Sequence, residues 1–268
     1  SIGCKSPSSL GATVTDQSST TWNGTAWSNG TPTATKRAVF TGAFTISTDL
    51  TACSCTINSC VNMTVPSGRT LTITNALTVS SGASLTFDNN ASLVQTTNAV
   101  NSGNITYIRS TTPVNRYDYI YWSVPVTATP GITLHDVSPT TLADKYQSFN
   151  SATSSWVISY NGALVMTPGQ GYIIRGPQGN ASPAAFQASF TGVPNNGNIT
   201  FSPVATKWNL IGNPYPSAID ADRLINDAGV GALYFWTHSN QPDENTNGNA
   251  TYNYDSDDYS VYTLSGST

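Results

Sequence analysis

The sequence is poor in charged residues: only 9% of its 268 residues are Asp, Glu, Lys or Arg, against roughly 25% in an average soluble domain. It contains one glutamate, Glu244, four lysines and two methionines. Glutamate, lysine and methionine all favour long helices. Their scarcity therefore argues against a helical fold.

Basic clusters and long apolar runs are also missing. The ten Lys and Arg residues are scattered apart from Lys36 and Arg37, and the net charge is −4. A nucleic-acid-binding protein needs a basic stripe that neutralises phosphates, so we expect no nucleic-acid partner. No apolar run approaches the roughly 20 residues of a spanning helix, so the sequence predicts no membrane-spanning segment.

Residues that carry catalysis are few. His135 and His238 are the only histidines, and neither a G-x-S-x-G nor an H-E-x-x-H pattern occurs. A glycosidase needs two carboxylates across a sugar, and the one glutamate lies in a loop-like stretch. We therefore predict that the chain is not an enzyme. The best enzymatic rival is a solenoid-type polysaccharide lyase, for which Arg69 is the candidate basic residue.

Hydroxyl and amide side chains take the place of charge: there are 39 Thr, 33 Ser and 25 Asn. Threonine favours strands, whereas serine, asparagine and glycine favour turns. This mixture predicts an all-β fold of many short strands joined by tight turns.

An internal repeat divides the chain. Residues 65–73 (VPSGRTLTI) recur 14 residues later as residues 79–87 (VSSGASLTF). Each unit reads as a turn followed by a strand with one apolar face, and such units bury that face only by stacking. We predict an N-terminal arm or cap over residues 1–34 and a short, β-helix-like β-solenoid over residues 35–108. An ordinary β-meander is the alternative.

Aromatic residues become dense after Tyr107, and short predicted strands separated by Gly, Pro and Asn turns follow, among them residues 197–201 and 208–212. This texture predicts a β-sandwich domain over residues 109–268. Asp220 begins the one convincing helix start.

Four cysteines, Cys4, Cys53, Cys55 and Cys60, allow three pairings that the sequence does not separate. Disulfides are the leading interpretation and would require an oxidising compartment. Free thiols and a metal site are the alternatives, although C-x-C-x4-C lacks the usual zinc-knuckle spacing.

Three strings in the second half resemble a known family. They are residues 119–126 (YIYWSVPV), residues 168–172 (PGQGY) and residues 208–217 (WNLIGNPYPS). Together they are similar to the surface and secreted proteins of Bacteroidota that the type IX secretion system exports, in a module that lies ahead of a C-terminal sorting domain. The resemblance implies export to the outer cell surface, and gliding-motility and adhesion proteins are prominent members. It implies no reaction.

Two candidate sites follow from local composition. Asp255, Asp257 and Asp258 could supply oxygen ligands to calcium, the one candidate cofactor. Trp22 and Trp27 lie in turn-rich sequence, and they suit either a cap over the open end of the solenoid or an exposed platform for a glycan. The string at residues 208–217 predicts a buried strand from Trp208 and a structural corner, with a ligand site as the alternative.

The function expected from the sequence is a non-enzymatic cell-surface adhesin or stalk segment of a type IX-secreted protein, for attachment or display. A glycan or other surface ligand and the secretion machinery are the expected partners, and the expected location is extracellular, at the outer cell surface. The alternatives are a carbohydrate-binding module of a secreted polysaccharide-degrading enzyme and a passive cargo or spacer module.

Overall fold

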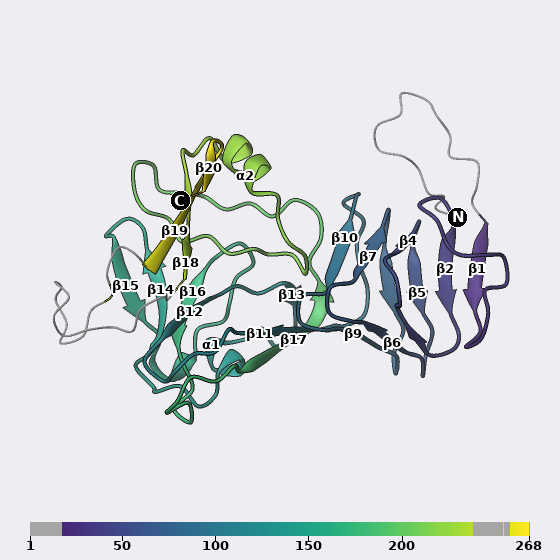
Figure 1. Cartoon of the computed structure of the whole chain (residues 1–268), viewed down its shortest axis with the longest axis horizontal. Helices are drawn as coiled ribbons and strands as arrows, with labels where there is room; N and C mark the ends of the chain where they lie inside the picture. The colour runs from purple at the N-terminus through teal and green to yellow at the C-terminus, as the bar shows by residue number, and fades with distance from the viewer. Residues whose placement is uncertain (1–17, 238–253, 255–257, 268) are drawn as a thin grey trace.

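The computed structural model describes residues 18–237, 254 and 258–267. Its described part is nearly all β, as predicted: the strands of a parallel β-solenoid are followed by antiparallel sheets (Figure 1). Neither of its two α-helices has the length and hydrophobicity needed to cross a membrane.

The solenoid has three faces, because each full coil contributes one short parallel strand to each of three sheets. The first face contains β1 (Ser19–Trp22), β2 (Arg37–Phe40), β5 (Cys55–Ile57) and β8 (Leu77–Val79). The second face contains β3 (Phe44–Thr45), β6 (Asn62–Val65), β9 (Ser84–Phe87) and β11 (Ile105–Ser110). The third face contains β4 (Leu50–Ala52), β7 (Thr70–Ile73) and β10 (Ser92–Gln95).

The stacking period differs from the 14-residue repeat. Met63 pairs with Leu85 and Leu71 with Leu93, an offset of 22 residues, and other neighbouring parallel strands have offsets from 17 (Ala38 with Cys55) to 21 (Leu50 with Leu71). Residues 65–73 and 79–87 are two corners with their flanking strands; the corner at residues 74–76 lies between them, and they are not stacked. The sequence repeat therefore marks a recurring corner, whereas the period of a three-sided coil also includes the third side.

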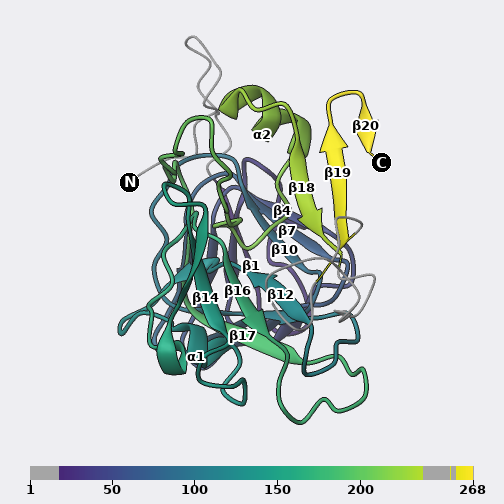
Figure 2. The same ribbon diagram turned by 90° about the vertical axis from the view of Figure 1, so that its left-hand side faces the viewer.

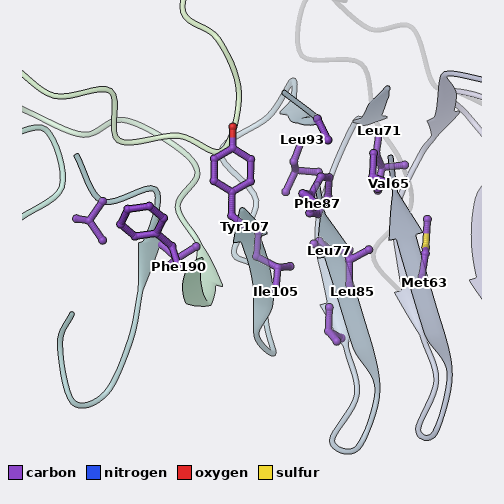
Figure 3. Packing of buried hydrophobic residues seen from close by; sticks show 14 of the residues in the cluster. Met63, Val65, Leu71, Leu77, Leu85, Phe87, Leu93, Ile105, Tyr107 and Phe190 are labelled. Atoms are coloured by element: carbon purple, nitrogen blue, oxygen red, sulfur yellow. The ribbon is translucent and has the colours of Figure 1, made fainter. Parts of the chain in front are cut away.

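Inward side chains stack in ladders that form the core (Figure 3). On the second face, Met63, Leu85 and Ile105 are each about 1% exposed, and they occupy equivalent positions of successive coils. Alternate residues of each strand are buried, the two-residue period expected of a half-buried strand. Each coil thus covers the apolar side chains of its neighbours.

Outward positions of the second face carry a ladder of threonines. Thr45, Thr64, Thr86, Thr106 and Thr191 pair in register across five strands. Neighbouring strands lie about 4.8 Å apart, so the threonine side chains form one continuous row. This row explains why a strand-rich surface can be built with so few charges.

Four corners of the solenoid have the same type of turn. The turns at residues 58–61, 66–69, 80–83 and 88–91 are each closed by a hydrogen bond from the fourth residue to the carbonyl of the first. The third residue always has positive φ: Cys60 (62°), Gly68 (72°), Gly82 (77°) and Asn90 (64°). A positive φ at this position is the requirement of a type II turn and favours Gly or Asn. Cys60 is therefore the unfavourable residue of the set.

The second half begins by extending the solenoid. β17 (Gln187–Pro194) pairs antiparallel with β11 along six residues, and β13 (Val126–Thr127) pairs with β17. At the other end, β1 lies in the segment predicted as an arm or cap, and it adds a parallel strand to β2. The second face thus continues into the second half without a break.

The remaining elements form two antiparallel sheets. One contains β12 (Tyr119–Trp122), β16 (Tyr172–Arg175), β14 (Tyr146–Asn150) and β15 (Ser155–Ile158). The other contains β18 (Leu233–Trp236), β19 (Tyr259–Thr263) and β20 (Gly266–Ser267). Figure 2 shows β18 and β19 side by side, next to α2. The short helices are α1 (Leu134–Val137), α2 (Ala221–Ala228) and the 3-10 turn η1 (Tyr160–Gly162).

Asp220 caps α2 as its sequence predicts, because its carboxylate accepts the Arg223 backbone N–H at 3.0 Å.

Two strand predictions are wrong. Residues 197–201 form no strand, and residues 208–212 contain only an isolated bridge at Ile211. Both segments have apolar residues, but they run over the surface as connections.

Replacing Cys60 by glycine should stabilise the protein by up to about 1 kcal/mol, because glycine adopts a positive φ without the cost that a Cβ adds. Gly82→Ala, at the equivalent corner of the next coil, should destabilise by about 1 kcal/mol. Urea unfolding of both variants measures the two shifts. Equal stability of Cys60→Gly and the parent chain would contradict this account of the corner.

Candidate functional site

Trp22 and Trp27 close the first coil. The Trp27 ring lies 5.3 Å from that of Phe40, and the Trp22 ring lies 5.0 Å from that of Phe44. The Trp22 indole N–H donates to the carbonyl of Ala43 at 2.9 Å. Both tryptophans are partly buried against the core, which matches the cap interpretation. The glycan platform at these two residues stays a prediction.

The candidate calcium ligands cannot be placed together. Asp255 and Asp257 lie outside the described residues, and Asp258 is fully buried. The Thr237 backbone N–H and hydroxyl both donate to the Asp258 carbonyl oxygen, at 2.8 and 2.9 Å. Among the residues that the structure describes, no group of three or more His, Cys, Asp or Glu side chains could hold a metal ion. The calcium site therefore stays a prediction.

The disulfide prediction is wrong for two cysteines. Cys55 and Cys60 are free thiols, the first buried and the second exposed. They cannot pair because Cys55 points into the core of the first face, whereas Cys60 occupies a solvent-facing corner. Cys53 is fully buried and is not among the free cysteines, and Cys4 lies outside the described part of the chain.

The three strings of the family resemblance meet in space. Gly171 and Gly212 donate their backbone N–H groups to the carbonyls of Leu210 and Gly169, at 3.3 and 3.0 Å, so the second string pairs with the third. The Ser123 hydroxyl of the first string donates to the Asn213 carbonyl at 2.8 Å. The strings therefore form one corner of the fold.

Glycine is required at position 212 by close approach. A Cβ there would lie 2.4 Å from the Gln170 carbonyl oxygen and 2.6 Å from the Ser123 Cβ. Any side chain would separate the three strings.

The third string also attaches the second half to the solenoid. The Leu93 backbone N–H of β10 donates to the Pro216 carbonyl at 2.8 Å. Nearby, the Asn196 amide donates to the carbonyls of Thr97 and Ala99, and the Asn101 amide donates to that of Pro194. Amide side chains, and not ion pairs, thus connect the two halves in this region.

Trp208 departs from its prediction. Its side chain is 62% exposed, and its ring packs edge-on against Tyr234 at 4.8 Å. The next residues along the string, Asn209 and Leu210, line a cleft of about 410 Å³ between the β14–β15 hairpin and residues 201–210. The string is therefore a structural corner at one end and part of a cleft at the other. The exposure of Trp208 has no signal in the sequence, where it heads an apolar run.

A layer of aromatic side chains lies between β12 and the β18–β19 hairpin. The hydroxyls of Tyr121 and Tyr259 are 2.6 Å apart, and the Trp236 indole N–H donates to the Tyr119 carbonyl at 2.7 Å. The Tyr121 and Trp236 rings meet edge to face at 5.9 Å. Because these polar groups are satisfied within the protein, the layer is a structural contact between β12 and the β18–β19 pair.

Comparison with known proteins gives one match. Residues 13–268 match the family model of a domain of unknown function, DUF8693. Neither the curated proteins nor the solved structures contain a match to the chain.

Thiol labelling should distinguish Cys53, Cys55 and Cys60 by their reactivity. Burial raises the pKa of Cys55 to about 12, so this thiol stays protonated and unreactive while the protein is folded. Iodoacetamide should modify Cys60 in the native protein and Cys55 only after denaturation, and Cys53 should require reduction as well. Peptide mass spectrometry reads the three stages. Native labelling of Cys55 would contradict its burial.

The aromatic layer should stabilise the folded protein less at alkaline pH than at neutral pH. Burial, and secondarily the hydrogen bond with Tyr259, raise the pKa of Tyr121 above its ordinary value near 10, and burial also raises the pKa of Tyr254. A raised folded-state pKa gives stability that is complete below pH 10 and is lost as the unfolded tyrosines ionise above it.

Urea unfolding between pH 8 and pH 11.5 should therefore show a fall that begins near pH 10. Tyr121→Phe removes one of the ionising groups, so its stability should fall less steeply over the same range. An equal fall in both proteins would show that Tyr121 is not responsible.

Proposed function

The chain belongs to the DUF8693 family, a domain of unknown function, and we propose from its structure that it is a non-enzymatic attachment or display module at the outer cell surface. The single observation that supports this proposal is the arrangement of the two halves. The stacked coils extend along the long axis of the molecule, and the antiparallel sheets lie at one end of the stack (Figure 1).

A stack of coils suits a stalk because each coil contacts only its neighbours, so length is added without changing the fold. The outward threonine row and the low charge give a surface of hydroxyl and methyl groups. Such a surface can contact uncharged material without a layer of counterions. The resemblance of the three strings to type IX-secreted surface proteins adds the expected location and export route.

The test is an adhesion assay with product analysis. Beads that carry the purified protein should adhere to surfaces coated with polysaccharide or with extracellular matrix, and beads that carry albumin should not. The supernatant should contain no released oligosaccharide or peptide above the buffer control. Release of soluble product would overturn the non-enzymatic proposal, and absence of adhesion on every surface would overturn the attachment role.

A further inference from the structure

The cleft beside Trp208 has an uncharged lining. It lies between the β14–β15 hairpin and residues 201–210, and its volume is about 410 Å³. Ser148 and Asn150 line one wall, Phe201 and Leu210 line the other, and Gln170 also contributes. None of its lining residues is acidic or basic. A charged ligand would find no opposite charge here, so the cleft suits a neutral one.

The polar groups of the cleft fall into two kinds. The Asn209 amide is occupied, because it donates to the carbonyls of Val204 and Lys207 and accepts the Val204 N–H at 2.8 Å. It therefore shapes the wall. Within the described residues, the side chains of Gln170 and Ser148 make no hydrogen bond. They remain available to a ligand as an amide and a hydroxyl, each able both to donate and to accept.

An exposed aromatic pair includes the chain neighbour of the cleft residue Asn209. Trp208, next to Asn209 in the chain, is 62% exposed, and Tyr234 against it is 48% exposed. The two rings meet edge to face at 4.8 Å, and the exposed part of the Trp208 ring offers a flat apolar surface. Pockets that combine such apolar surface with a few placed polar groups are the usual small-ligand sites.

A second cleft, of about 340 Å³, is lined in part by polar groups that already have hydrogen-bond partners within the protein. It lies at the junction of the two halves, and Asn101, Asn195 and Asn196 are among its lining residues. All three amides donate to backbone carbonyls. Its polar groups are thus used to hold the chain together. The cleft beside Trp208 differs because the side chains of Gln170 and Ser148 are not used in this way.

We propose that the cleft formed by Ser148, Gln170 and the residues beside Trp208 binds a neutral polysaccharide. Sugar rings present hydroxyls that pair with amide and hydroxyl side chains, and apolar C–H faces that lie against an indole. Gln170 and Ser148 bind the hydroxyls of one sugar unit, and Trp208 receives the ring of a neighbouring unit at the rim. This inference rests on the proposed attachment function and assigns its ligand class and site.

The test is affinity electrophoresis in native gels. The gels contain a neutral polysaccharide (glucomannan, xylan, laminarin or hydroxyethyl cellulose) or an anionic one (alginate or polygalacturonate). At least one neutral polymer should retard the protein, and the anionic polymers should not. Gln170→Ala and Trp208→Ala should each raise the dissociation constant about tenfold or more, the loss expected for 1.4 kcal/mol of contact.

Tyr160→Ala is the matched control, because Tyr160 is an aromatic residue with 67% exposure that does not line the cleft. It should bind as the parent chain does. Equal melting temperatures of the variants show that the fold is intact. If Trp208→Ala melts early, Ser148→Ala together with Gln170→Ala tests the same cleft without changing residues 208–217.

The outcomes separate the site from the function. Retardation by a neutral polymer that no cleft variant weakens would overturn the site and leave the attachment function standing. Binding to anionic polymers alone, or to a protein ligand and no glycan, would overturn the ligand class. Absence of adhesion in the bead assay is the separate result that would remove the function itself.

Discussion

The structure depends on one constraint: the inward side chains of each coil can be covered only by the coils before and after it. A coil has three short strands, so alone it would expose every residue of its inner ladder. Stacking at an offset of 22 residues places Met63 beneath Leu85 and Leu71 beneath Leu93. The turns at residues 58–61, 66–69, 80–83 and 88–91, each with one residue at positive φ, return the chain in that register.

The same constraint explains both ends of the stack. At the first coil the inner ladder would meet water, and Trp22 and Trp27 lie there against Phe40 and Phe44. At the last coil β17 pairs with β11 in the opposite direction, so the second face continues into the second half. The solenoid therefore ends in an antiparallel sheet and not in a separate linker.

Low charge shapes the rest of the molecule. Where the two halves meet in the region of residues 93–101, amide side chains and backbone groups make the connections. The threonine row gives the outer face a regular hydroxyl surface, and the cleft beside Trp208 is uncharged. A protein built in this way is suited to contact neutral, hydroxylated material, which is the common basis of the proposed function and of the proposed ligand class.

The sequence by itself determined the all-β class, the presence of a solenoid, several of its strands and the capped start of α2. These follow from local preferences: alternating apolar residues, turn residues at fixed offsets and a capping carboxylate. Only the tertiary structure decided the offset of 17 to 22 residues between neighbouring coils, the convergence of the three strings, the free state of Cys55 and Cys60, and the exposure of Trp208. Each of these features depends on which distant segments contact a residue. A local pattern of apolar and polar residues does not specify those tertiary contacts.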